Sequence, residues 1–176
     1  MKVNSRKKQS RALEDVFQVV VETPRGCRNK YKFNPQTRRM KLSKVMPEGM
    51  MFPYDFGFFP DTKGEDGDPL DVLILNDDGT FPGCEIECRL IGVLKAEQTE
   101  QGQQKRNDRL IAVATASVLY GSIEELSDLE PAVLKQVEEF FVNYQKVRDI
   151  KFEIVKREGS HSASKLVSAA SRNKAA

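Results

Sequence analysis

The feature that most constrains this fold is a series of short strand-like segments separated by turn residues. Such segments occupy residues 16–23, 30–33, 39–45, 71–75, 84–95, 109–118 and 151–155. One segment instead repeats apolar residues at helical steps, and its stripe consists of Leu134, Val137, Phe141, Tyr144 and Val147. Before it, Ser127 and Glu130 form a capping-box pattern and Pro131 suits a first helical turn. Many short strands and one main helix predict a closed, antiparallel barrel with helices packed against it.

A chain of 176 residues is typical of one folded domain. We expect a basic, flexible arm at 1–15, a barrel domain at 16–157 and a Ser/Ala-rich helical tail at 158–176. The fold class is then α+β and mainly β: a closed antiparallel OB-like barrel with one main packed helix and a C-terminal helical tail. No stretch approaches the roughly 20 apolar residues of a membrane span, and no apolar segment follows the N-terminal charges. These patterns predict a cytoplasmic protein.

The chain contains a single histidine, His161, which lies in the predicted tail. Nucleophilic catalysis by Ser-His-Asp or Cys-His groups needs an imidazole next to the nucleophile, and many metal sites need several histidines. An enzyme of this composition must therefore use carboxylates, lysines, arginines and tyrosines. Hard cations with oxygen ligands are its natural cofactors.

The near balance of 28 basic and 26 acidic residues hides an uneven distribution. Residues 22–46 contain eight basic residues and one acid, whereas residues 48–100 contain thirteen acids and three basic residues. One interpretation is a solvated surface that carries both signs. The other is a basic pair of strands facing an acidic loop.

Three aspartates lie within six residues in the segment Asp-Gly-Asp-Pro-Leu-Asp at 66–71. Gly67 permits unusual backbone angles and Pro69 stiffens the chain, so a fixed bend can direct several carboxylates at one point. Neighbouring carboxylates raise each other's pKa, and a bound divalent cation removes that cost. The spacing does not match an EF-hand. An exposed Asx turn is the alternative to a metal site.

The segment DGDPLDVLI resembles the signature of the family I soluble inorganic pyrophosphatases, in which three aspartates hold magnesium. Further segments resemble the family in the same order over about 16–155: VVVETPRG, NKYKFNPQT, FPYDFGFFP, GCEIECRLIGVLK, RLIAVA and EFFVNYQKV. This resemblance implies a magnesium-dependent hydrolase, an inorganic diphosphatase that splits pyrophosphate into two phosphates with several Mg²⁺ ions. It also implies a homo-oligomer, with a hexamer as the bacterial form, and no membrane or nucleic-acid partner.

The resemblance assigns roles to individual positions. Asp66, Asp68 and Asp71 match the metal-binding aspartates, and Asp68 matches the general base for the attacking water. Glu22 matches an acid of the outer shell. The matching substrate-binding positions are Lys30, Lys44, Arg109 and Tyr144, with Lys146 as a further candidate. Tyr144 is alternatively a plain member of the apolar stripe.

The family has a second acidic cluster in the region that corresponds to 97–108. Glu100 and Asp108 are the metal ligands we expect there, with Glu97 as another source of a carboxylate. In the family this cluster ends with an aspartate, and that position aligns with Asn107 rather than with Asp108. A solvated hairpin tip is the alternative for Glu97 and Glu100.

Several positions depart from the family pattern. Phe52 and Phe56 replace tyrosines, Lys32 replaces a glutamate, and Gln145 replaces a phosphate-binding lysine. Arg109 stands for a lysine and Lys44 for an arginine, which keeps the charge but changes its geometry. Two other functions therefore stay open: a divergent phosphohydrolase acting on another phosphoanhydride or phosphoester, and a non-catalytic barrel that binds nucleotide or nucleic acid.

Overall fold

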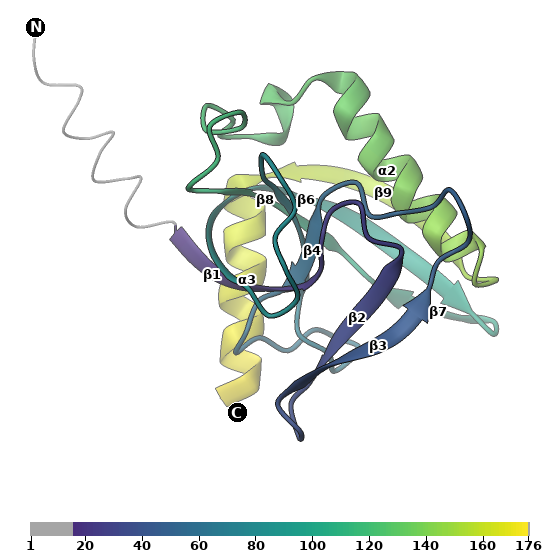
Figure 1. Ribbon diagram of the computed structural model, residues 1–176. Coiled ribbons are helices and arrows are strands. Elements are labelled where there is room, and N and C mark those ends of the chain that lie inside the picture. Colours follow the sequence, from purple (N-terminus) through teal and green to yellow (C-terminus); the bar gives the residue numbers. More distant parts are fainter. Residues whose placement is uncertain (1–15, 176) are drawn as a thin grey trace, which may run out of the picture.

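The computed structural model describes residues 16–175, so the predicted N-terminal arm lies outside the described residues (Figure 1). Over these described residues the fold is mainly β with two α-helices, as the sequence pattern predicts. The elements in chain order are β1 (Val16–Thr23), β2 (Asn29–Asn34), β3 (Arg39–Val45), β4 (Asp55–Phe58), β5 (Asp71–Leu75), β6 (Glu85–Glu100), β7 (Gln103–Arg106), β8 (Arg109–Ala114), the 3₁₀ helix η1 (Leu126–Asp128), α2 (Pro131–Lys146), β9 (Lys151–Gly159) and α3 (Ser160–Ala175).

The main sheet has the strand order β1-β4-β5-β8-β6-β7, and both β9 and β1 also pair with β6. Strands β2 and β3 form a separate hairpin. The pairing of β5 with β8 is parallel, whereas the other pairs are antiparallel. The prediction of an entirely antiparallel sheet is therefore wrong at this pair. The chain between β5 and β8 contains β6 and β7, and a crossover of this length lets the chain return in the same direction.

The sixteen-residue strand β6 connects the parts of the sheet. Its first half pairs with β1, and its central part pairs with β8, with Cys88 opposite Ala114. Its last residues pair with β7, so Glu97 lies opposite Arg106. The polar segment 97–108 is therefore an extended hairpin, with Gln101 and Gly102 at positive φ in its turn.

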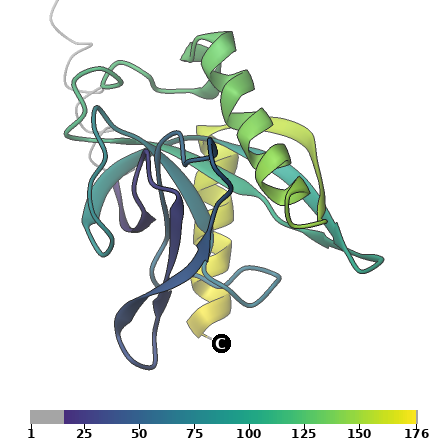
Figure 2. The same cartoon turned by 45° about the vertical axis from the view of Figure 1, so that its right-hand side comes forward.

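Two apolar clusters of the described residues form the core, and each includes residues of a different α-helix. Helices α2 and α3 run along different parts of the sheet (Figure 2). Leu94 of β6 packs in the cluster that contains Phe141 of α2. The neighbouring Val93 packs in the cluster that contains Val167 of α3. This division follows from the period of two along a strand, which sends successive side chains to opposite faces. The helices therefore contact the sheet through different sets of strand residues.

Helix α2 begins at Pro131 as predicted, but its N-cap differs from the expected capping box. Glu130 is the N-cap and makes no side-chain capping hydrogen bond, while Ser127 lies inside η1. The carboxylate of Asp128 instead accepts hydrogen bonds from the backbone N–H groups of residues 124 and 125, at 3.0 and 2.9 Å. The acidic side chain thus stabilises the turn before the helix.

The C-terminal segment is helical as expected, and it is also part of the core. Ala163, Val167 and Ala170 of α3 are buried. Their spacing of four and three residues places them on one helix face. Their small size lets the helix approach the sheet closely, so this segment packs as an integral element rather than as a frayed end.

Candidate active site

The three aspartates lie in and just after the loop that joins β4 to β5. Backbone hydrogen bonds fix this loop: the amide of Phe59 donates to Leu70 at 3.0 Å, and that of Gly64 donates to Asp68 at 2.8 Å. Gly67 has a φ of 88°, which a residue with a Cβ rarely adopts. Asp66 Oδ1 accepts the amide N–H of Asp68 at 3.1 Å, the bond of an Asx turn. The expected fixed bend is therefore present.

Two of the aspartates each contact a cation of the chain itself. Asp68 Oδ2 lies 2.8 Å from Lys32 Nζ, and both side chains are more than half exposed. Asp71 Oδ2 lies 2.8 Å from a terminal nitrogen of Arg109, whose side chain is buried. A basic strand and an acidic loop therefore meet here, which explains the uneven charge along the sequence.

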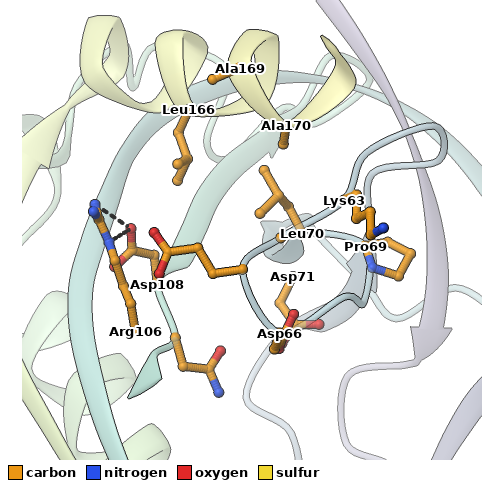
Figure 3. A pocket seen from close by; sticks show the side chains of 13 residues that line it. Lys63, Asp66, Pro69, Leu70, Asp71, Arg106, Asp108, Leu166, Ala169 and Ala170 are labelled. Carbon is orange, nitrogen blue, oxygen red and sulfur yellow. Dashed lines mark hydrogen bonds and ion pairs between the residues drawn. The ribbon is translucent and has the colours of Figure 1, made fainter. Parts of the chain in front are cut away.

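A cavity of about 180 Å³ lies beside the aspartate loop (Figure 3). Asp66 and Asp71 line one side of it, and Arg106 and Asp108 line another. A third side is apolar and is formed by α3, through Leu166, Ala169 and Ala170. The segment predicted as a helical tail after the barrel domain thus contributes a wall next to the site.

The two predicted ligands of the 97–108 hairpin have different surroundings. Asp108 is buried, and its Oδ2 lies 3.1 Å from Lys95 Nζ and 2.9 Å from the guanidinium of Arg106. Its Oδ1 accepts the amide N–H of Ala96 at 3.1 Å. Glu100 is exposed at the end of β6, opposite Gln103, and does not line the cavity. Asp108 therefore borders the site, whereas Glu100 lies at the hairpin turn.

Cations gather around Tyr144 at the other end of the site. Lys30 Nζ lies 5.1 Å from the centre of the Tyr144 ring and 5.2 Å from that of Phe56. Lys44 is the cross-strand partner of Lys30 in the β2–β3 hairpin. The Tyr144 hydroxyl is buried without a hydrogen-bond partner. Lys146 is exposed at the last residue of α2. Lys30, Tyr144 and Arg109 therefore lie beside an aromatic ring or an aspartate, and Lys44 faces Lys30. These are four of the five predicted substrate-binding residues.

Arg109 links the two ends of the site. Besides its ion pair with Asp71, its guanidinium lies 5.5 Å from the ring centres of both Phe141 and Phe152. Its Nε is buried without a hydrogen-bond partner. A carboxylate loop, a buried arginine and a lysine over the ring of Tyr144 together suit a small, multiply charged anion and its counter-cations.

The comparison with known proteins agrees with this geometry. The model of a family described as inorganic pyrophosphatase matches residues 19–175. The chain belongs to the inorganic pyrophosphatase family. An inorganic pyrophosphatase of Leifsonia xyli is 37% identical over 158 residues, which are 89% of this chain and 94% of that protein. The solved structure of inorganic pyrophosphatase from Thermus thermophilus has a TM-score of 0.85 at 28% identity and covers 92% of each chain.

The departures from the inorganic pyrophosphatase pattern are packed into the fold. Phe52 and Phe56 are buried, with ring centres 5.2 Å apart, in the cluster that also holds Tyr144. Gln145 is buried, and its Oε1 accepts a hydrogen bond from Arg148 at 2.8 Å. Arg148 was not predicted as a site residue. Its spacing of four residues from Tyr144 is the signal that could have identified it.

The donor set suits the magnesium ions that this family membership implies. Carboxylate oxygens are the ligands that Mg²⁺ prefers, and Asp66, Asp68 and Asp71 share one short segment. Within residues 16–175, no three Asp, Glu, His or Cys side chains are already grouped so that they could hold a metal ion. Asp68 and Asp71 are instead paired with Lys32 and Arg109. A metal at these oxygens would replace or share those contacts.

Glu22 is a buried carboxyl of the site, and its Oε1 accepts the amide N–H of Phe33 at 2.7 Å. Burial raises its pKa, and the charge of Asp71 adds to this, while the Phe33 hydrogen bond and Lys30 and Lys32 act in the opposite direction. The pKa of Glu22 is therefore higher in the folded protein than the value near 4.5 of the unfolded chain. Its ionisation destabilises the fold, so the stability of the protein falls as pH rises from about 4.5 through the folded pKa.

We therefore expect Glu22→Gln, which can still accept the Phe33 hydrogen bond, to stabilise the protein at pH 8. The expected gain is about 1 kcal/mol, or about 3 °C in Tm. At pH 4 the two proteins should melt at similar temperatures. Thermal melts from pH 4 to 8 in EDTA measure this difference. An equal gain in Tm at every pH would contradict the explanation that ionisation of Glu22 destabilises the fold.

No helix within residues 16–175 combines the length and the apolar composition that crossing a membrane requires.

Proposed function

We propose that this chain hydrolyses inorganic pyrophosphate to two phosphates with Mg²⁺ as cofactor. The observation that carries the proposal is the pairing of the aspartate loop with Lys32 and Arg109, in a chain of the inorganic pyrophosphatase family that also places Lys30 over the Tyr144 ring. Pyrophosphate is highly anionic, so its site needs both fixed cations and bound metal ions. The chain supplies both the fixed cations and the carboxylate ligands for metal ions.

In this proposal Asp66, Asp68 and Asp71 hold the metal ions, with Asp108 at the border of the cavity as a further ligand. Glu100, at the hairpin turn, stays a predicted ligand that the cavity lining does not support. When bound, divalent ions neutralise the substrate, lower the pKa of the attacking water and orient it. Asp68 also accepts the proton of that water at a carboxylate oxygen. Its more than half exposed side chain leaves this oxygen open to solvent.

The lysines and the arginine bind the phosphate groups. Lys30 and Lys44 are cross-strand partners, so both can act on one phosphate. Arg109 is buried and fixed between Asp71 and two aromatic rings, which reduces the entropy lost on binding. Negative charge that develops on the leaving phosphate is stabilised by such pre-oriented cations.

We also infer that the main sheet closes into the expected barrel. The pairing of β1 with both β4 and β6 supports this closure, since the order β1-β4-β5-β8-β6 then returns to β1. A closed sheet has no free edge among these strands and holds β5 and β8, which carry Asp71 and Arg109, in fixed register. The cytoplasmic location and the homo-oligomeric state stay predictions.

The deciding experiment measures phosphate release from pyrophosphate while Mg²⁺ is titrated. We expect no release in EDTA and a rate that rises with Mg²⁺ until it saturates. Absence of release with Mg²⁺, Mn²⁺ or Zn²⁺ between pH 6 and 9 would exclude the proposal.

The packed Phe52, Phe56 and Gln145 favour one second candidate, a divergent phosphohydrolase. These residues remove polar groups that the family resemblance implies at the site. A panel of nucleoside triphosphates, polyphosphate and phosphoesters tests this candidate. A higher kcat/KM for any of these than for pyrophosphate would favour it.

A further inference from the structure

Arg148 lies in the turn directly after α2, and the buried Gln145 holds it in place. The Arg148 amide donates to the backbone oxygen of Gln145 at 2.9 Å, and its guanidinium donates to Gln145 Oε1 at 2.8 Å. The Gln145 side chain is only 2% exposed. The amide of Ile150 also donates to the backbone oxygen of Gln145, at 3.1 Å. The direction of the guanidinium is therefore set by a buried neighbour.

The guanidinium of Arg148 and the ammonium of Lys30 lie close to the same tyrosine. Their distances from the centre of the Tyr144 ring are 5.7 and 5.1 Å. Neither cation forms an ion pair with a carboxylate within the part of the chain that the structure describes. Two like charges in this arrangement repel each other, and an anion bound between or beside them removes that repulsion.

Two buried polar atoms at this place also lack hydrogen-bond partners among residues 16–175. They are Arg148 Nε and the hydroxyl of Tyr144. Buried donors without partners cost free energy, which a bound acceptor restores. The unpaired charges and the unpaired donors thus both favour an acceptor-rich anion, and a phosphate group has both properties.

We infer that Arg148 is a substrate-binding residue that contacts a phosphate group of pyrophosphate together with Lys30 and Tyr144. This inference rests on the proposed function for the identity of the substrate. Arg148 then restores the positive charge that is lost where Gln145 stands in place of a lysine. The guanidinium can donate two parallel hydrogen bonds to a phosphate, which an ammonium cannot.

The test is the affinity for inorganic phosphate, measured by isothermal titration calorimetry in EDTA, where no turnover takes place. We expect Arg148→Met to raise the Kd about five- to tenfold, in line with the loss of a charged hydrogen bond. Arg148→Lys, which keeps the charge, should raise it about twofold. Lys135→Met is the matched control, because Lys135 is exposed near the start of α2 and pairs with Glu139 on the same helix. Its Kd should equal that of the wild type.

The possible outcomes separate this inference from the proposed function. Unchanged phosphate affinity in Arg148→Met overturns the role of Arg148 even if the wild type hydrolyses pyrophosphate. A wild type that binds no phosphate overturns it as well. A wild type that binds phosphate through Arg148 but hydrolyses no pyrophosphate keeps the anion site and excludes the proposed reaction.

Discussion

Replacement of Asp68 by asparagine is expected to lower kcat for pyrophosphate by about a thousandfold. The change keeps the size of the side chain but removes its negative charge and nearly all of its basicity. An asparagine can neither accept the proton of the attacking water nor provide a charged oxygen for a divalent ion. Loss of a general base alone typically costs between about a hundredfold and ten-thousandfold.

The same substitution should leave the fold nearly unchanged. Asp68 is exposed, and its side chain forms with Lys32 an ion pair of the kind that contributes little to stability. A thermal melt in EDTA should therefore show a Tm within about 2 °C of the wild type. Activity is measured as phosphate release at saturating Mg²⁺ and substrate. Glu85→Gln, which removes an exposed acid at the start of β6, serves as the control and should keep full activity.

Retention of more than about a tenth of the wild-type kcat in Asp68→Asn would contradict the role of Asp68 as base. In that case Asp66 or Asp71 would become the candidate, and the corresponding asparagine variants would identify it. A large fall in Tm would instead show that Asp68 has a structural role that the ion pair with Lys32 does not reveal.

The elements that could be predicted from the sequence are those with a strong local pattern. Strand β1 matches the β-branched run at residues 16–23, and α2 begins at Pro131 as expected. Strand β4 was not predicted, because its four residues are all buried and lie among prolines and glycines. Such a segment shows no alternation of polar and apolar residues. The parallel pairing of β5 with β8 depends on long-range contacts, which local patterns do not report.

The candidate site also combines residues that could be predicted from the sequence with residues that could not. The aspartate loop could be recognised because its three acids, glycine and proline lie within six residues. The roles of Arg148 and α3 could not, because they depend on how distant segments pack. Arg148 is defined by its position over the Tyr144 ring, and α3 by a stripe of small residues with weak hydropathy. Hydropathy patterns identify large apolar residues more readily than alanines that allow close approach.

Replacement of Lys32 by glutamate is expected to increase the affinity for Mg²⁺ by about 30-fold or more, and Lys32→Met by about tenfold. In the structure the Lys32 ammonium occupies the contact of Asp68 Oδ2 at 2.8 Å. The hydrogen bond with Asp68 raises the pKa of Lys32, so the lysine stays charged at neutral pH. A positive charge about 5 Å from a divalent ion opposes binding by a free energy of this order even in water.

The expected gain in Mg²⁺ affinity comes from removing the repulsion between Lys32 and the metal ion, and not from breaking the ion pair of Lys32 with Asp68. The side chains of Lys32 and Asp68 are 52% and 60% exposed, so breaking their contact costs little. Lys32→Met removes one positive charge, and Lys32→Glu also adds the carboxylate that the family resemblance implies at this position. The order of affinities should therefore be Glu, then Met, then Lys. The differences should become smaller at high ionic strength, because salt screens exposed charges.

Calorimetric titration of each substrate-free protein with Mg²⁺ and with Mn²⁺ measures these affinities directly. The Mg²⁺ concentration for half-maximal phosphate release should shift in the same order. Lys135→Glu makes the same charge change on α2 and controls for the net charge of the protein. Equal Mg²⁺ affinity in Lys32→Glu and the wild type would mean that the metal does not bind close to Asp68. Because this titration contains no substrate, such a result would contradict the proposed metal site. It would not bear on the binding of pyrophosphate.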